Sequence, residues 1–157
     1  MSIENTHEIE DSLEKYGVFA SHTRGFSMWP LFRTHRDIVY IAKADKPLKR
    51  GDVALYTGGD GKYILHRVLR VKDKEYLIRG DNTYRIEHVP HECVIGVLME
   101  FDRKGKHHTT SDLSYRFYSA LWMLLYPLRF VAYHTARALW RLYKRLFKKQ
   151  SRSNPEQ

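Results

Sequence analysis

The chain has 157 residues, of which 43% are hydrophobic and 13% aromatic, so it can form one buried core but is short for two independent domains. This composition excludes an intrinsically disordered chain. Charge is unevenly distributed, because residues 113–157 contain nine Lys and Arg residues but a single acidic residue, Glu156. That segment carries +8 of the formal net charge of +9, and residues 1–112 are close to neutral.

Three features bear on location. Cys93 is the only cysteine, which excludes an intramolecular disulfide and suits a reducing compartment. The acidic N-terminus lacks the basic and then apolar pattern of a secretory signal, so we expect no export by that route. The longest nearly apolar run, residues 117–128, is shorter than the roughly 20 residues of a membrane-spanning helix, so we expect no conventional transmembrane segment.

The N-terminal two thirds predict a short helix followed by a mainly β domain. Apolar residues among acids predict a helix over residues 3–16, ended by Gly17. Short β-rich runs separated by turn residues then predict strands. These runs are Val18–Thr23, Asp37–Ala42, Asp52–Thr57, Tyr63–Lys72, Tyr76–Arg79 and Cys93–Phe101. The glycine-rich residues 58–61 predict a hairpin turn rather than a phosphate-binding loop, because no Lys-Ser or Lys-Thr pair follows.

The C-terminal third predicts helix. A helical pattern runs from Leu113 to Lys149 and is interrupted at Pro127. One face would be apolar (Ala136, Leu139, Trp140, Tyr143, Leu146 and Phe147) and the other basic (Arg137, Arg141, Lys144, Arg145 and Lys148). The predicted segments are an N-terminal helix (1–16), a β domain (17–102), a linker (103–112), an amphipathic helical tail (113–149) and a disordered terminus (150–157).

Three polar residues at predicted strand ends and turns suggest a catalytic site. Ser27 follows the first predicted strand, between Gly25 and Pro30, and a serine needs a nearby base to become a nucleophile. His66 lies in an apolar strand, and Asp81 follows another strand, where a carboxylate can orient an imidazole. Each residue alone has an ordinary explanation as a turn residue or a structural histidine. Together they predict a Ser–His–Asp site.

Five ordered sequence blocks resemble the signal peptidase I superfamily of serine peptidases, which includes the self-cleaving repressors of the SOS response. The blocks are Gly25–Pro30, Lys49–Val53, Leu65–Val68, Arg79–Asn82 and Val94–Val97. His66 resembles the archaeal and eukaryotic-type branch, because the bacterial branch has a lysine base at this place. The resemblance implies a β-rich peptidase fold and cleavage through an acyl-enzyme, with Ser27 as nucleophile and His66 as general base.

The resemblance leaves the third catalytic residue open. Asp81 matches the family's Gly-Asp-Asn aspartate and is the first choice, with Glu87 as the alternative because histidine-type members can use an acid further along the chain. Some family members have, at the position of Gly25, a hydroxyl that helps to bind the oxyanion. Because glycine has none, we expect backbone N–H groups, first that of Ser27, to donate hydrogen bonds to the oxyanion. The other residues expected near the substrate are Met28, Pro30 and Asn82.

The tail predicts a partner. Aromatic and basic residues together over residues 113–149 are typical of a helix in an anionic membrane interface. The alternatives are a helical hairpin packed on the β domain and a nucleic-acid surface, the latter not expected because no recognisable motif accompanies the charge. We expect peripheral membrane association, on the cytoplasmic side, which would hold the site close to membrane-associated substrates.

His88, His91 and Cys93 form an H-x-x-H-x-C cluster that matches no common zinc pattern, so we expect no metal and no cofactor. The hypothesis is therefore a serine endopeptidase that cleaves a peptide or precursor protein with Ser27 and His66. Two alternatives are a catalytically silent peptidase fold that binds a membrane or partner, and a self-processing regulator.

Overall fold

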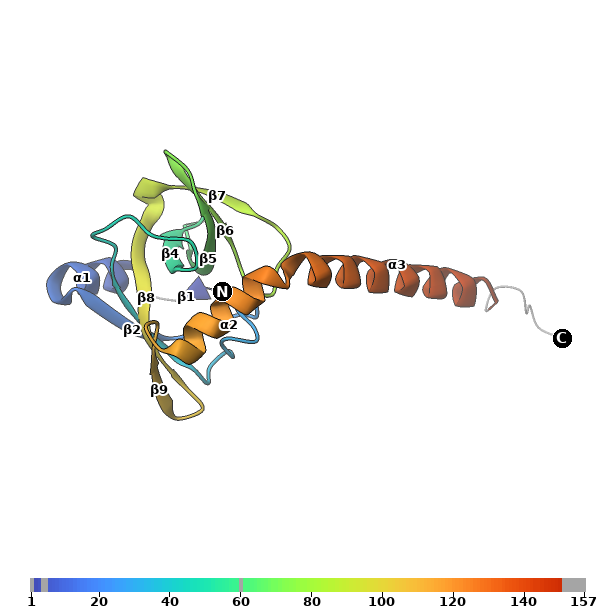
Figure 1. Cartoon of the computed structure of the whole chain (residues 1–157), viewed down its shortest axis with the longest axis horizontal. Coiled ribbons are helices and arrows are strands. Elements are labelled where there is room, and N and C mark those ends of the chain that lie inside the picture. Colours follow the sequence, from blue (N-terminus) through green and yellow to red (C-terminus); the bar gives the residue numbers. More distant parts are fainter. Residues whose placement is uncertain (1, 4–5, 60, 151–157) are drawn as a thin grey trace. The chain divides into compact units, whose positions relative to one another are not determined.

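A computed structural model describes residues 2–3, 6–59 and 61–150 of the chain (Figure 1). The chain divides into two compact units, residues 1–123 and residues 124–157. The first unit is mainly β, with a short N-terminal helix, and the C-terminal segment is helical (Figure 1). The predicted fold class is thus confirmed.

In the described part of the chain, nine strands form one antiparallel sheet. The strands are β1 (Ser2–Ile3), β2 (Val18–His22), β3 (Ile38–Lys43), β4 (Val53–Thr57), β5 (Tyr63–Val71), β6 (Glu75–Arg79), β7 (Glu87–Pro90), β8 (Val94–Arg103) and β9 (Lys106–Thr109). Their order is β2-β3-β8-β4-β5-β6-β7, with β1 paired to β5 and β9 paired to β8. A single-turn 3-10 helix, His91–Cys93, joins β7 to β8. All six strands predicted from the sequence are present.

The predicted N-terminal helix is α1, which covers Thr6–Tyr16. It ends as expected at Gly17, whose φ of 72° is the left-handed conformation that suits a helix C-terminus. The Gly17 N–H donates to the carbonyl of Leu13 at 3.0 Å, which satisfies one of the carbonyls left at the helix end. Ile9 and Leu13 are buried, so this helix covers part of the core.

The predicted turn at residues 58–61 joins β4 to β5 as a hairpin. Gly58 N–H donates to the Lys62 carbonyl at 2.8 Å, and Gly61 has a φ of 76°. Glycine adopts this φ without the steric cost that a side chain would meet. The hairpin brings β4 beside β5, with Ala54 opposite His66.

Two predicted segment boundaries require correction, and one strand was missed. Ser2–Ile3 form strand β1 rather than the start of the predicted N-terminal helix, which begins at Thr6. Residues 103–112 are not a simple linker, because β9 forms a hairpin with β8 in which Arg103 pairs with Lys106. Lys104 and Gly105, with φ of 54° and 73°, make the turn. β7 was not predicted, since only Val89 in this strand is buried and no alternation of apolar residues shows in the sequence.

Two hydrophobic clusters lie on opposite faces of β5, because successive side chains in a strand point to opposite faces. Tyr63 and Leu65 belong to the larger cluster, and Val68 belongs to the smaller one. The larger cluster also contains Tyr115 from α2 (Leu113–Leu124). His66 and Arg67 are therefore directed to different sides of the sheet.

The predicted C-terminal helix is two helices. The first is α2 and the second is α3 (Tyr126–Gln150). Pro127 is the second residue of α3, where a missing N–H costs no helical hydrogen bond. The predicted disordered terminus, residues 150–157, lies outside the described residues except for Gln150. None of the described helices combines the length and the apolar character needed to cross a membrane.

Candidate active site

Ser27 and His66 form a hydrogen-bonded pair. Ser27 Oγ lies 2.7 Å from His66 Nε2. Ser27 is in the turn after β2 and is half-buried, whereas the His66 side chain on β5 is 7% exposed. The turn is anchored because the next residue, Met28, is fully buried in the larger cluster. The structure thus joins the two residues that the sequence singled out as nucleophile and base.

Glu87 occupies the other side of the imidazole. Its Oε1 lies 3.1 Å from His66 Nδ1, and Tyr56 Oη donates to Oε2 at 2.6 Å. Tyr56 Oη is also 3.2 Å from His66 Nδ1. A carboxylate only accepts hydrogen bonds, so Nδ1 carries the proton and Nε2 is left to accept from the Ser27 hydroxyl. Ser27, His66 and Glu87 are therefore linked in the order of a serine hydrolase triad.

The surroundings favour the protonation states that a general base needs. Burial lowers the pKa of His66 below its ordinary value, and the hydrogen bond to Glu87 opposes this without overcoming it. The hydrogen bond from His66 holds the pKa of Glu87 below its ordinary value, and the bond from Tyr56 acts in the same direction. Near neutral pH the imidazole is neutral and the carboxylate is charged.

Asp81, the first choice as the partner of His66, is placed elsewhere. Arg67 Nε donates to Asp81 Oδ1 and Arg67 Nη2 to Oδ2, both at 2.8 Å. The two side chains are 1% and 3% exposed, so this is a buried, bidentate ion pair. His66 and Arg67 are neighbours on β5, so their side chains point to opposite faces of the sheet. Asp81 lies on the face of Arg67 and binds it rather than His66. The structure thus places the alternative acid, Glu87, at His66.

Gly80 packs closely against Ser27 and His66. A Cβ atom added to Gly80 would lie 2.6 Å from the Ser27 carbonyl oxygen and 2.9 Å from His66 Nε2. Both distances are too short for any larger residue. The next residue but one, Asn82, donates its N–H to the Ser27 carbonyl at 2.7 Å and its side-chain amide to the Phe26 carbonyl at 3.2 Å. The segment after β6 therefore holds the Ser27 turn in position.

The other residues expected near the substrate have varied surroundings. Gly25 is exposed, has a φ of 87° and accepts a hydrogen bond at its carbonyl from Thr34. The Pro30 carbonyl accepts from Arg103 Nη2 at 3.1 Å. Met28 is part of the core rather than of an open surface, because the turn needs an apolar anchor there.

The H-x-x-H-x-C residues make separate contacts. His88 Nδ1 lies 3.0 Å from a Glu75 carboxylate oxygen at the surface. The ring of His91 lies 4.2 Å from that of Tyr76, between centroids. Cys93 is half-buried and packs against the smaller hydrophobic cluster. Within the described residues, no group of three or more metal-ligating side chains is assembled.

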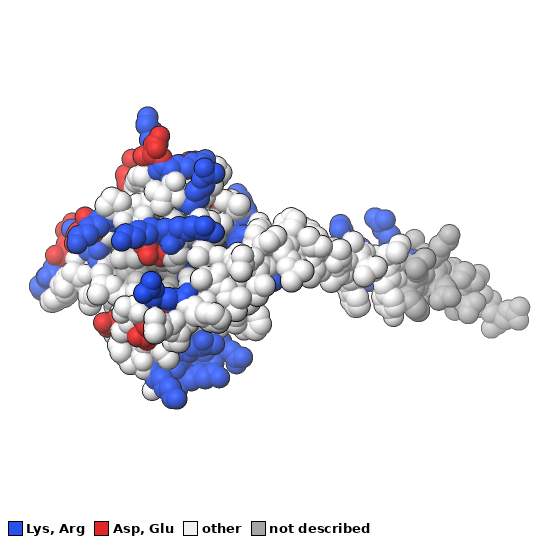
Figure 2. Space-filling model, in the orientation of Figure 1, with Lys and Arg blue, Asp and Glu red and all other residues white. Residues whose placement is uncertain are grey.

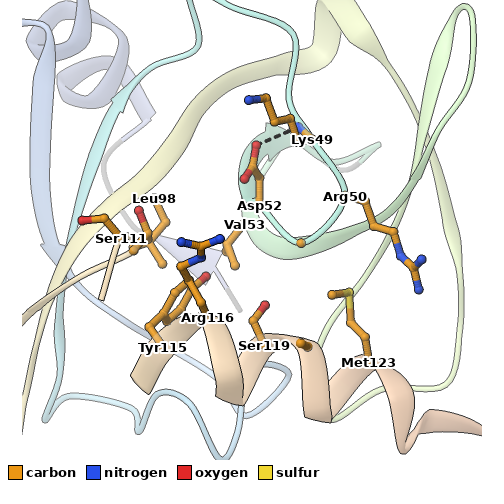
Figure 3. Close-up of a pocket in the computed structure, with 13 residues that line it drawn as sticks. Lys49, Arg50, Asp52, Val53, Leu98, Ser111, Tyr115, Arg116, Ser119 and Met123 are labelled. Atoms are coloured by element: carbon orange, nitrogen blue, oxygen red, sulfur yellow. Dashed lines mark hydrogen bonds between the residues drawn. The ribbon is translucent and has the colours of Figure 1, made fainter. Parts of the chain in front are cut away.

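A cavity of about 610 Å³ lies between the residue 49–53 turn and α2 (Figure 3). Ser119 and Met123 point from α2 toward the turn (Figure 3). Three basic residues, Lys49, Arg50 and Arg116, also line the cavity. Neither Ser27 nor His66 lines this cavity. Its wall is instead tied to the Arg67–Asp81 pair, because Arg67 Nη1 donates to the Gly51 carbonyl at 2.9 Å and to Ser119.

The sequence matches no protein-family model and no curated protein. Evidence about function therefore comes from the arrangement of the side chains. Sequence reasoning missed two of them, Tyr56 and Arg67. Tyr56 gave no signal because it fits an apolar strand, and Arg67 lies in the same sequence block as His66 but its buried partner is distant in the chain.

Proposed function

We propose that the chain is a serine endopeptidase with Ser27 as nucleophile, His66 as general base and Glu87 as the residue that orients His66. One observation carries this proposal: Ser27 Oγ lies 2.7 Å from His66 Nε2, and Glu87 lies 3.1 Å from the other ring nitrogen. Hydrogen-bonding reach between nucleophile and base, with a third group behind the base, is the arrangement that activates a serine. The resemblance to the signal peptidase I superfamily supports the same reaction class.

The reaction follows from these roles. His66 Nε2 takes the Ser27 proton while Oγ attacks the peptide carbonyl carbon, and the resulting imidazolium is stabilised by Glu87. Collapse of the tetrahedral intermediate breaks the C–N bond, and His66 gives the proton to the leaving amine. A water molecule, deprotonated by His66, then attacks the acyl carbon. The bond between that carbon and Ser27 Oγ breaks, His66 returns the proton to Oγ, and the carboxylic acid product leaves. Backbone N–H groups, first that of Ser27, are the proposed donors to the oxyanion, because Gly25 has no hydroxyl.

A serine-reactive fluorophosphonate probe tests the nucleophile without a known substrate. We expect wild-type protein to be labelled, mass spectrometry to locate the adduct on Ser27, and Ser27→Ala to lose the label. Ser111→Ala is the matched control, because Ser111 is exposed and outside the triad, and it should label as the wild type does. Labelling that persists in Ser27→Ala, or no labelling of the folded wild type, would contradict the assignment. Incubation with a peptide library then tests for endopeptidase cleavage.

An extended peptide can approach Ser27 along β5. One edge of β5 pairs with β6, and this pairing begins at Arg67. On the same edge, before His66, Tyr63 and Ile64 pair with the short strand β1. A strand edge binds extended peptides through backbone hydrogen bonds. Because β1 has only two residues, a substrate that uses this edge would have to displace few contacts.

Removing residues 1–5 should therefore lower KM for a peptide substrate by roughly 5-fold, the effect of about one net hydrogen bond, with kcat unchanged. The measurement is steady-state kinetics on the shortened and full-length proteins, with the melting temperature as a check on folding. Ile3→Pro in the full-length chain should act in the same direction, since proline weakens strand pairing. An unchanged or raised KM would exclude this edge as the peptide's position.

A further inference from the structure

Helix α3 has two chemically different faces. Large apolar side chains on one face are exposed, with Leu128 and Leu139 each at 67%, Val131 at 57% and Leu142 at 54%. From Arg137 onward the opposite face is basic and includes, among residues with described side chains, Arg137, Arg141, Lys144 and Arg145. No Asp or Glu occurs in residues 126–150. On the side that Figure 2 shows, α3 has white surface with Lys and Arg but no acidic side chains.

The other aromatic helix of the tail, α2, belongs to the first unit up to Met123. Tyr115 of α2 is buried in the larger cluster. Tyr118 Oη donates to the Asp81 carboxylate at 3.1 Å, and Trp122 Nε1 donates to the Asp81 carbonyl at 3.0 Å. These aromatic side chains pack in the first unit. Apolar side chains of α2 are exposed as well, among them Leu113 and Phe117, but of the two helices α3 is the one that combines such side chains with a cluster of basic residues.

We propose that α3 binds the surface of a membrane that contains anionic lipids, lying in the plane of the interface. The face with Leu128, Leu139 and Leu142 enters the boundary between head groups and acyl chains, while the basic face contacts the lipid phosphates. A helix of 25 residues is about 37 Å long, so it can make these contacts along its length. The 18-residue apolar stretch that a spanning helix needs is absent from it.

The two faces together favour a lipid surface over other partners. A nucleic acid would neutralise Arg137 and Arg141 but would leave the large apolar side chains in water. A second copy of α3 could bury the apolar face, but it offers no acidic side chain to the basic one and would bring like charges together. An anionic membrane satisfies both faces at once. This inference goes beyond the proposed peptidase activity and does not depend on Ser27.

Sedimentation of the full chain with lipid vesicles tests the proposal. We expect binding to vesicles of phosphatidylcholine with 30% phosphatidylglycerol (roughly a physiological anionic fraction), weak binding to phosphatidylcholine alone, and release at high salt. The variant Arg137→Gln/Arg141→Gln/Lys144→Gln should bind at least about 10-fold more weakly, because each basic residue near an anionic surface contributes to the attraction. The variant Leu128→Ser/Leu139→Ser should also lose binding.

Controls separate the helix from general charge and from catalysis. The variant Lys46→Gln/Lys104→Gln/Lys106→Gln removes the same charge from exposed positions in the first unit and should bind as wild type. Ser27→Ala should also bind as wild type, so failure of the peptidase proposal would leave this result unchanged. Equal loss in the charge control, undiminished binding of the α3 variants, or binding to DNA or RNA but not to vesicles would overturn the proposal.

Discussion

Replacing His66 by alanine should lower kcat/KM for peptide cleavage by roughly 10⁴-fold or more, the scale on which serine hydrolases depend on their base. The replacement removes the acceptor that lies 2.7 Å from Ser27 Oγ. The residual activity should resemble that of Ser27→Ala, because the two residues act as one unit and their losses do not add. Steady-state kinetics on a cleaved library peptide measures all three proteins.

His88→Ala is the matched control for this experiment. His88 is an exposed histidine on β7, where it lies beside Glu75 rather than in the triad. Its replacement should leave kcat/KM within about 2-fold of wild type, as is usual for surface positions. Loss of activity in His88→Ala would point to a general effect on β7, and full activity of His66→Ala would exclude His66 as the base.

The pH profile gives an independent measure of the same base. Activity requires neutral His66, so kcat/KM should be lost as pH falls through its pKa in the free enzyme. Burial lowers this pKa, which places the midpoint of the acidic limb below the ordinary histidine value. Because the bond to Glu87 raises the pKa, removing that carboxylate should move the midpoint to lower pH still.

The sequence was sufficient to single out Ser27 and His66, which the structure places 2.7 Å apart, because each lies in a short block whose local pattern, a turn or an apolar strand, is visible along the chain. It was insufficient for the acid. Glu87 reaches His66 through the pairing of β5 with β6 and of β6 with β7, and β7 has a single buried residue. Strand register of this kind is set by tertiary packing rather than by local pattern.

Asp81 shows the converse difficulty. A carboxylate at a strand end next to Gly80 suggested a catalytic acid, but the alternation of β5 brings it to Arg67 instead. Likewise, residues 106–109 looked like a linker because an edge strand with exposed polar side chains shows no apolar alternation. The first difference arises because the partner, Arg67, lies 14 residues away in the chain, and the second because the turn at Lys104 and Gly105 was not recognised.

Two networks meet at the segment after β6. The hydrogen-bonded residues Ser27, His66 and Glu87 lie on one side of β5, and the Arg67–Asp81 pair with its contacts to α2 lies on the other. Gly80 joins these two networks. It lies so close to Ser27 and His66 that an added Cβ atom would collide with both. The next residue, Asp81, accepts a hydrogen bond from Arg67. We infer that Asp81 is a positioning residue for the Ser27 turn, whereas Glu87 acts on the base itself.

Replacing Asp81 by asparagine should therefore lower the free energy of unfolding by about 3–5 kcal/mol, because it leaves the buried Arg67 guanidinium without its charge partner. Glu87→Gln should change stability much less, since Glu87 is partly exposed, but should lower kcat by roughly 10²–10⁴-fold and shift the pH midpoint. Urea unfolding measures the first effect and kinetics the second.

The double variant Arg67→Met/Asp81→Leu sharpens this distinction. Replacing a buried ion pair with apolar residues of similar size often restores the stability lost when one partner is removed. If Asp81 only positions the site, the double variant should recover both folding and much of the activity, with a pH midpoint close to that of wild type. A stable double variant with activity as low as His66→Ala would instead assign Asp81 a direct catalytic role, and unaltered kinetics of Glu87→Gln would remove Glu87 from the triad.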